Sequence, residues 1–221
     1  MHVVIPTAIE DDNPTIALAI ESIQLHTDHD IVTIGHDLGV AEHIYCPQSL
    51  QSRDRWANTD RAMRAACERY ETFIWSADDI YWTRPADPLM WALGDLAETV
   101  RRAEHGRRKQ VTLEWLRAQD LPTWDYEAHV PMPIDAAIML DVLGTIEHAP
   151  RLDKRTLYGN HAGIPDMIAP DVKVRTPDIA DTPWLSSDGA RHIDLIEAKI
   201  RGDKAAYPRH ARGLVESTSH P

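Results

Sequence analysis

The sequence predicts an α/β fold with a mixed, mainly parallel sheet flanked by helices. Short apolar runs alternate along the chain with stretches whose apolar residues recur at helical spacing. The run at 73–75 is continuously apolar, which is typical of a parallel strand buried on both faces. A length of 221 residues suits one domain with a substantial core. We expect that domain to cover 1–208 and the polar residues 209–221 to form a disordered tail.

The composition is that of an ordinary globular protein, with 43% hydrophobic and 26% charged residues. The net charge of −12 argues against non-specific attraction to nucleic acid or to anionic membranes. Two cysteines are too few for a disulfide framework or a cysteine-rich zinc site, which favours a reducing compartment. No apolar run is long enough to span a bilayer, and the first residues lack a signal-peptide pattern. We therefore expect a cytoplasmic protein without a membrane span.

The first elements form a βαβ unit. His2–Thr7 is the first predicted strand, Pro14 begins a helix, and 31–34 is the second strand. Gly35, His36 and Asp37 follow at the carboxyl end of that second strand. The unit contains neither the glycine pattern of dinucleotide-binding folds nor a P-loop.

A polar-faced helix is predicted next. After a short strand at 43–46, the stretch 53–70 carries apolar residues on one stripe and several polar ones on the other face. Arg55 and Asn58 are three residues apart, so they share a face near the start of the helix, where anions are favoured.

Two adjacent acids, Asp78 and Asp79, follow the central strand. Ligands of α/β sheets bind outside the carboxyl ends of the strands, which is where these acids are expected to lie. Two like charges disfavour each other's ionisation unless a cation neutralises them, and Mg²⁺ or Mn²⁺ prefers such oxygen ligands. The alternatives are acids solvated in a loop or acids in the first turn of a helix.

The segment 101–109 holds five basic residues and one glutamate, and is the only basic cluster in this acidic chain. A solvated helix end with a turn at Gly106 is the favoured interpretation. The alternative is a mobile arm that contacts phosphate, either of a donor diphosphate or of a nucleic-acid backbone.

The second half offers polar side chains in unusual settings. The proline-rich stretch 122–133 carries His129 and predicts a shaped loop or edge strand. A helix is predicted at 135–143, a short strand at 171–174, and a loop at 184–189 ahead of a helix at 190–201. The cluster at 155–161 ends at His161, and Asp188 lies in the 184–189 loop.

The order of these elements, ending in the paired acids, resembles the GT-A glycosyltransferases. That family typically carries a D-x-D signature after this strand. Here FIWSADDI has Ser76 at the first acid, Asp78 at the second and Asp79 just beyond. In the second half YEAHVPMPID, RTLYGN and WLSSD are similar to segments of small bacteriophage-encoded glycosyltransferase-like proteins, and loosely to capsular-polysaccharide phosphotransferases. The resemblance covers about residues 3–188.

The resemblance implies a GT-A-like (Rossmann-like) catalytic domain and a set of donor contacts. Asp78 or Asp79 would hold a metal on the donor diphosphate, and Thr7 and Asp37 would border the nucleoside. Arg55 and Asn58 fall where the family often has donor-contacting residues.

Sugar transfer with inversion also needs a group that takes the acceptor's proton. His129 and Asp188 are the candidates for this catalytic role, and His161 is a candidate third metal ligand. We expect these groups and the 158–161 turn to converge on the carboxyl edge, facing Asp78 and Asp79. The alternative is that His129 packs under Trp124 and Asp188 only caps the following helix.

The sequence thus leads to the hypothesis of a metal-dependent glycosyltransferase that uses a nucleotide-sugar donor. A sugar-1-phosphate transferase and a non-catalytic nucleotide-sugar-binding module are the alternatives. The acceptor stays open, with a modified DNA base or a glycan as the classes considered. The charge of −12 argues against tight duplex binding unless the basic cluster at 101–109 compensates.

Overall fold

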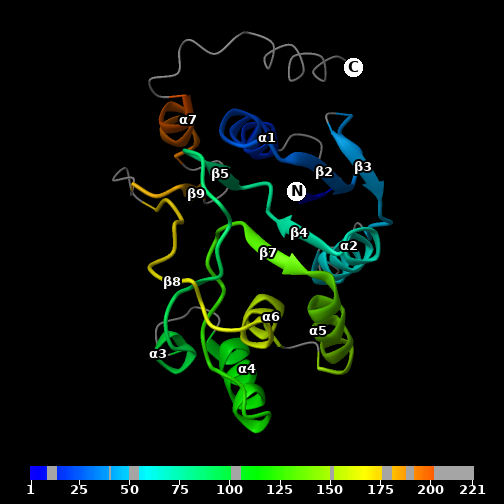
Figure 1. Cartoon of the computed structure of the whole chain (residues 1–221), viewed down its shortest axis with the longest axis vertical. Coiled ribbons are helices and arrows are strands. Elements are labelled where there is room, and N and C mark those ends of the chain that lie inside the picture. Colours follow the sequence, from blue (N-terminus) through cyan, green and yellow to red (C-terminus); the bar gives the residue numbers. More distant parts are fainter. Residues whose placement is uncertain are drawn as a thin grey trace.

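The protein is built around a five-stranded sheet with the strand order β3-β2-β1-β4-β7 (Figure 1). The computed structural model describes residues 1–8, 14–39, 41–49, 55–100, 106–149, 152–175, 181–187 and 192–201, with the backbone alone for Pro14 and Arg55. The strands are β1 (His2–Thr7), β2 (Asp30–Gly35), β3 (Glu42–Tyr45), β4 (Thr72–Trp75) and β7 (Met132–Asp135). Strands β1 to β4 run parallel, and β7 runs antiparallel to β4. The predicted mixed, mainly parallel sheet is confirmed.

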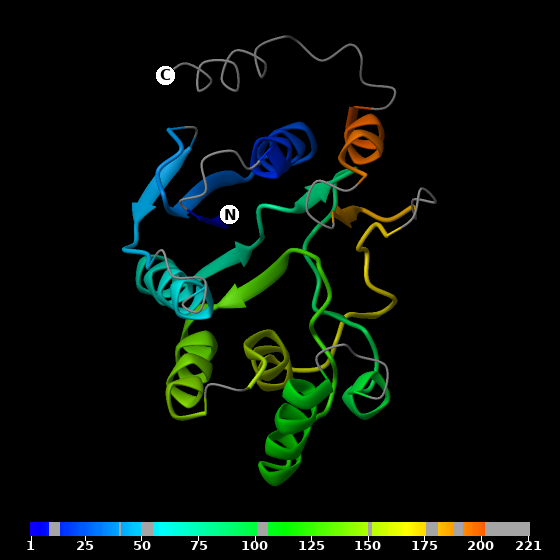
Figure 2. The same cartoon turned by 180° about the vertical axis from the view of Figure 1, so that it is seen from behind.

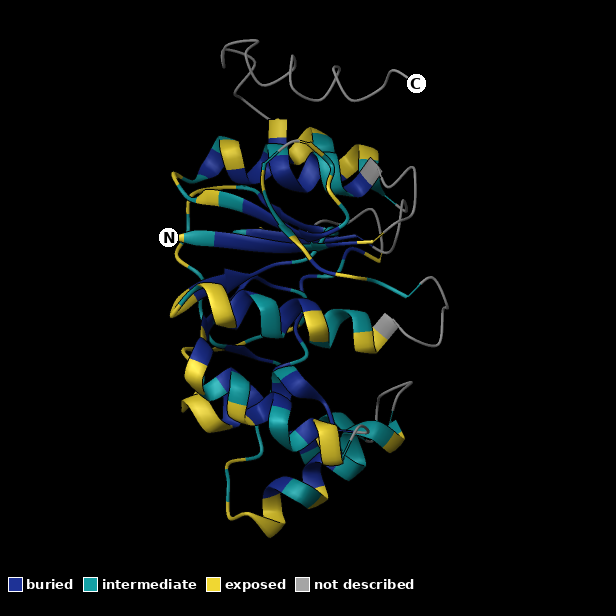
Figure 3. Cartoon of the chain, turned by 90° about the vertical axis from the view of Figure 1, so that its right-hand side faces the viewer, coloured by how far each residue is buried: buried dark blue, intermediate teal, exposed yellow. Residues whose placement is uncertain are grey.

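Helices cover both faces of this sheet, and the inner strands β1, β2 and β4 are largely buried (Figure 3). They are α1 (Pro14–His26) and α7 (Ile193–Arg201) on one side, and α2 (Arg55–Arg69) and α5 (Ala136–His148) on the other. Side chains of β1 alternate between the two layers, as a strand's period of two requires. Val4 joins the core under α2 and α5, whereas Val3 and Ile5 join the core under α1.

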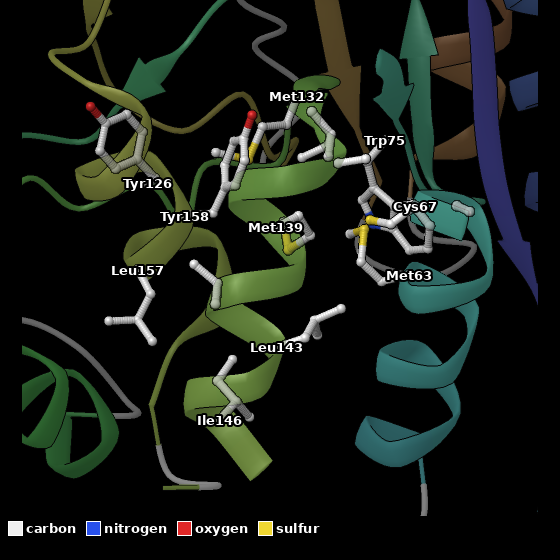
Figure 4. Close-up of a cluster of buried hydrophobic side chains, with 14 of the residues drawn as sticks. Met63, Cys67, Trp75, Tyr126, Met132, Met139, Leu143, Ile146, Leu157 and Tyr158 are labelled. Carbon is white, nitrogen blue, oxygen red and sulfur yellow. The ribbon is translucent and has the colours of Figure 1, made fainter. Parts of the chain in front are cut away.

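A further helical layer lies beyond α5. It consists of α3 (Leu96–Val100), α4 (Gly106–Ala118) and α6 (Lys154–Ala162), which gather at one end of the molecule in both Figures 1 and 2. Figure 4 shows the core that joins this layer to the sheet. Met139 and Leu143 of α5 lie between Met63 of α2 and Tyr158 of α6.

Two small two-stranded sheets complete the fold. In one, β5 (Ile80–Trp82) pairs antiparallel with β9 (Trp184–Ser186), and in the other, β6 (Trp91–Ala92) pairs parallel with β8 (Met167–Ile168). Both join segments that are far apart in the sequence. No helix in the described ranges combines the length and apolar character needed to cross a membrane.

Several expectations for the chain after β5 are wrong, and one is not tested. The region around 184–189 is not only a loop, because Trp184–Ser186 pairs with β5. The leucines at 89, 93 and 96 have helical spacing, which predicts a helix after Pro85, but Trp91–Ala92 is a strand and helix begins only at Leu96. The expected strand at 171–174 is reduced to one bridge, between Lys173 and Ser186. The proposed tail at 209–221 lies outside the described residues.

Candidate functional site

The topology brings distant segments to the carboxyl edge of β4. Strands β1, β2 and β4 are parallel, so their carboxyl ends meet at one edge of the sheet. Strand β2 lies on one side of β1 and strand β4 on the other, so the strand order reverses between β1 and β4. Such a topological switch point is the usual ligand site of open α/β sheets. Because β7 is antiparallel, its first residue, Met132, pairs with Trp75, the last of β4. The segment before Met132 therefore arrives at the same edge.

The paired acids form a turn between β4 and β5. The amide of Ile80 donates to the carbonyl of Ala77 at 3.3 Å, which turns the chain through Asp78 and Asp79. The chain beside β5 fixes Asp79 twice. The amide of Ser187 donates to its carbonyl at 3.1 Å, and the hydroxyl of Ser186 donates to its Oδ2 at 3.3 Å. Both acids are half-buried rather than fully solvated.

Burial dominates the electrostatics of Asp79. It raises the pKa of the Asp79 carboxyl, while the nearby charges of His129 and Lys173 and the hydrogen bond from Ser186 act in the opposite direction. The expected convergence of His129 on the paired acids stays a prediction. A carboxylate that is partly withdrawn from water gains more from a bound cation than a solvated one.

His129 is held by one carboxylate at two atoms. Its backbone amide donates to Oδ1 of Asp171 at 2.8 Å, and its ring Nδ1 lies 2.8 Å from Oδ2 of the same group. Burial alone would raise the pKa of Asp171, but the hydrogen bonds from His129 bring that pKa below its usual value. The ring is 38% exposed, so His129 does not pack under Trp124 as a core residue.

Arg155 supplies a cation between these acids and the helical layer. It lies in the first turn of α6 and donates from Nη2 to the carbonyl of Val130 at 2.8 Å. Burial lowers the pKa of its guanidinium, and the charges of Glu127, Asp171 and Asp79 oppose that shift. Its Nε is buried without a hydrogen-bond partner among the described residues. Arg155 thus lies among three carboxylates and retains donor capacity.

Burial alternates residue by residue in two stretches that carry polar groups. Tyr126, Ala128 and Val130 are buried, whereas Glu127 and His129 between them are not. Val172 and Val174 are likewise buried, while Asp171 and Lys173 are half-exposed. In both stretches the apolar side chains belong to the core and the polar ones are left partly accessible.

Thr7 and Asp37, predicted to border a nucleoside, do lie at the carboxyl ends of β1 and β2. The hydroxyl of Thr7 is 3.2 Å from the carbonyl of Ile34 and 2.6 Å from that of His36, so it ties the two strand ends together. Asp37 is exposed, and its Oδ1 accepts from the amide of Gly39 at 2.8 Å.

Arg55 and Asn58 begin α2, which also starts at this edge. The side chain of Arg55 is outside the described part of the structure. The amide group of Asn58 bonds both the backbone nitrogen (2.9 Å) and the carbonyl (2.8 Å) of Ser49, so it shapes the loop after β3. A donor contact of either residue stays a prediction.

The cluster at 155–161 is not the expected turn. Residues 154–162 form helix α6, in which Gly159 packs against the ring of Tyr126 and Asn160 bonds the backbone of Trp124. His161 is exposed at the end of this helix, with its ring centroid 6.1 Å from that of Trp115. In the part of the chain that the structure covers, no three His, Cys, Asp or Glu side chains gather as a metal-binding group. Asp188 lies outside the described residues.

The basic cluster at 101–109 is neither a helix end with a turn at Gly106 nor, where the structure describes it, a mobile arm. Gly106 begins helix α4 and does not form a turn, while 101–105 lie outside the described residues. Arg108 contacts Asp153 at 2.5 Å and lies 4.3 Å above the ring of Trp56, and Lys109 is paired with the buried Asp125. For Arg108 and Lys109 the proposed mobile arm is wrong, because both hold elements of the helical layer together.

Sequence reasoning missed Asp171, Arg155, Lys173 and Ser186. The alternation of Asp171-Val172-Lys173-Val174 was a usable signal, since it matches that of Glu127-Ala128-His129-Val130. Arg155 and Ser186 lie in stretches that the sequence analysis singles out, but nothing local assigns either of them to this site. Neither a protein-family model nor a curated protein sequence matches this chain. Its chemistry must therefore be argued from these residues.

Proposed function

We propose that the protein is a metal-dependent glycosyltransferase with a GT-A-like domain that uses a nucleotide-sugar donor. The observation that carries the proposal is the position of Asp78 and Asp79. They follow β4 at the switch-point edge, with His129 close enough to influence the charge of Asp79. Acids at the carboxyl end of a central strand, facing an imidazole, offer a donor site and a proton acceptor together.

The acids suit a divalent ion that is shared with the substrate. Mg²⁺ and similar ions are commonly bound by one or two carboxylates together with substrate phosphates and water, rather than by a full set of protein ligands. Two neighbouring carboxylates without a third ligand among the described residues match that mode. A cation would also offset the burial that raises the pKa of Asp79. When bound, Mn²⁺ or Mg²⁺ would neutralise the charge that develops on the departing diphosphate.

The remaining side chains of the edge have distinct proposed roles. His129 would take the proton of an acceptor hydroxyl, because its side chain is 38% exposed and its charge influences Asp79. Arg155 would add positive charge near Asp79. Thr7, Asp37, Arg55 and Asn58 would surround the nucleoside from the ends of β1 and β2 and the start of α2. The acceptor, whether a modified DNA base or a glycan, is left open.

Isothermal titration calorimetry of nucleoside diphosphates and nucleotide sugars, with and without Mn²⁺, tests the donor site. We expect at least one nucleotide to bind only when Mn²⁺ is present. Asp79→Asn and Asp78→Asn should each weaken that binding about tenfold or more, because loss of a charge-assisted ligand is worth about 1.5–3 kcal/mol. Asp120→Asn is the matched control, since Asp120 is exposed after α4 at a φ of 55° that asparagine tolerates.

Binding that is equal in the parent and in both edge variants would overturn the proposal. Product analysis then separates the related activities, since a sugar-1-phosphate transferase leaves a phosphodiester and a glycosyltransferase does not. A protein that binds the donor and never turns it over would be a binding module.

A further inference from the structure

The contact with Asp171 restricts both the position and the orientation of the His129 side chain. A single carboxylate bonds two donors of the same residue, the backbone amide through Oδ1 and the ring through Oδ2, each at 2.8 Å. Bonds at both the backbone and the ring hold the side-chain torsions of His129 in one arrangement. The side chain of Asp171 is only 21% exposed, so water competes little for these bonds.

The chemistry of the two groups determines where the ring proton lies. An ionised carboxylate only accepts hydrogen bonds, so Nδ1 must carry a proton to bond Oδ2. In a neutral imidazole the other nitrogen, Nε2, is then an acceptor. The pKa of Asp171 lies below its usual value, so this carboxyl is ionised wherever the ring is neutral.

From this geometry we infer that Asp171 is a positioning residue that holds His129 in the Nδ1–H tautomer, leaving Nε2 as the proton acceptor of the site. The inference rests on the proposed function for the use of that acceptor, but the tautomer itself does not depend on any substrate. Asp171 touches no reacting atom in this scheme and acts through His129.

The variant Asp171→Asn should reverse the tautomer. The carbonyl oxygen of asparagine has to accept from the backbone amide of His129, as Oδ1 does now. The amide nitrogen then faces the ring and, being a donor, requires an unprotonated Nδ1. The proton moves to Nε2, which can no longer accept one from a substrate. Turnover of any acceptor hydroxyl should fall by about 10²–10⁴-fold, the usual contribution of a general base.

Nitrogen-15 NMR of the imidazole rings in the full chain tests this directly. The protein has 12 histidines, and His129→Gln identifies the His129 signals by their loss. Spectra are recorded about two pH units above the ordinary histidine pKa of about 6.5, so that the rings are neutral. We expect the Nδ1–H pattern for His129 in the parent and the Nε2–H pattern in Asp171→Asn. Asp30→Asn is the matched control, because Asp30 lies 3.8 Å from Nδ1 of His2, and it should leave His129 unchanged.

The parent spectrum decides the matter even if Asp171→Asn fails to fold. An Nε2–H pattern in the parent, or the same pattern in a folded Asp171→Asn, would overturn the inference. Nucleotide binding is measured separately. We expect Asp171→Asn to keep Mn²⁺-dependent nucleotide binding within about twofold, since Asp171 is not a proposed ligand. Absence of nucleotide binding by the parent protein would instead count against the proposed function and would leave the tautomer result standing.

Discussion

Charged side chains in the helical layer and at the carboxyl edge are arranged in opposite ways. In the layer of α4 and α6, each of three cations contacts a carboxylate directly: Lys109 pairs with Asp125, Lys154 with Asp60 and Arg108 with Asp153. At the edge, His129 and Arg155 lie near several carboxylates, and Arg155 bonds a backbone carbonyl instead of an acid.

The difference separates charges that hold the fold from charges that can bind a ligand. In a pair such as Lys109 with Asp125 each charge compensates the other, and removing one partner leaves a buried charge uncompensated. Burial raises the pKa of Asp79 at the edge, and it also raises the pKa of Asp153 in the helical layer, to about 7. The two acids differ in their direct partners, because Asp153 contacts the guanidinium of Arg108 whereas Oδ2 of Asp79 accepts from the neutral hydroxyl of Ser186. Substitutions in the two regions should therefore change stability by different amounts and even in different directions.

The largest effect is expected from Lys109→Met in the helical layer. It would leave the carboxylate of Asp125, which is 0% exposed, without its cation. We expect the free energy of unfolding in urea to fall by about 3–5 kcal/mol. The double variant Lys109→Met with Asp125→Asn should recover most of that loss, because asparagine can still accept from the amide of Glu127. Arg107→Met changes the exposed neighbour and should cost little. An equal, small effect of Lys109→Met and Arg107→Met would remove the distinction between the two regions.

A smaller loss is expected from Gly159→Ala in α6. A Cβ at this position would overlap the ring of Tyr126, which is fully buried. Overpacking of this kind costs about 1–3 kcal/mol, and thermal unfolding would show it. Gly144→Ala in α5 is the matched control, because nothing lies within 4 Å of its added Cβ. Since alanine favours helix over glycine by about 1 kcal/mol, Gly144→Ala should stabilise the protein. A neutral Gly159→Ala would mean that α6 packs less tightly than its contact with Tyr126 implies.

The sequence predicted the elements up to β4 better than the later ones for a physical reason. Strands β1 and β2 are continuous apolar runs within one βαβ unit, so their pattern is local. Strands β9 and β5 pair although about a hundred residues separate them in the sequence, and the residues near Trp184 do not predict that pairing. The helix expected after Pro85 failed because the leucines at 89, 93 and 96 have helical spacing, yet Trp91 pairs with Met167 instead.

The same limit applies to the site. Asp78 and Asp79 were identified because their own neighbours in the sequence mark a strand end. His129 could be proposed from its proline-rich setting, but its partner Asp171 is 42 residues away. Arg155 reaches the edge only because α6 packs beside the stretch that leads into β7. The alternation at 171–174 marks that stretch, but no signal in the sequence shows that it pairs with His129.

The smallest effect, and the one of opposite sign, is expected from Asp79→Asn at the edge. The raised pKa of Asp79 means that the folded protein binds a proton there more tightly than the unfolded chain, whose aspartates titrate near about 3.9. Stability contributed by this group therefore increases as the pH falls through its folded pKa, and the ionised carboxylate lowers stability at neutral pH. Asparagine cannot ionise and still accepts from Ser186.

We expect Asp79→Asn to be neutral or to stabilise the protein by up to about 1 kcal/mol at pH 7, with the difference shrinking towards about pH 4.

Asp171→Asn should behave in the opposite way. The lowered pKa of Asp171 contributes stability above about pH 3.9, and that stability is lost as the pH falls through its folded pKa. Urea unfolding of both variants across this pH range measures the two slopes. If Asp79→Asn destabilises the protein at neutral pH as much as Asp171→Asn does, Asp79 is a structural acid like those of the helical layer. If it stabilises the protein and abolishes Mn²⁺-dependent nucleotide binding, the carboxylate is retained at a cost to folding because a ligand needs it.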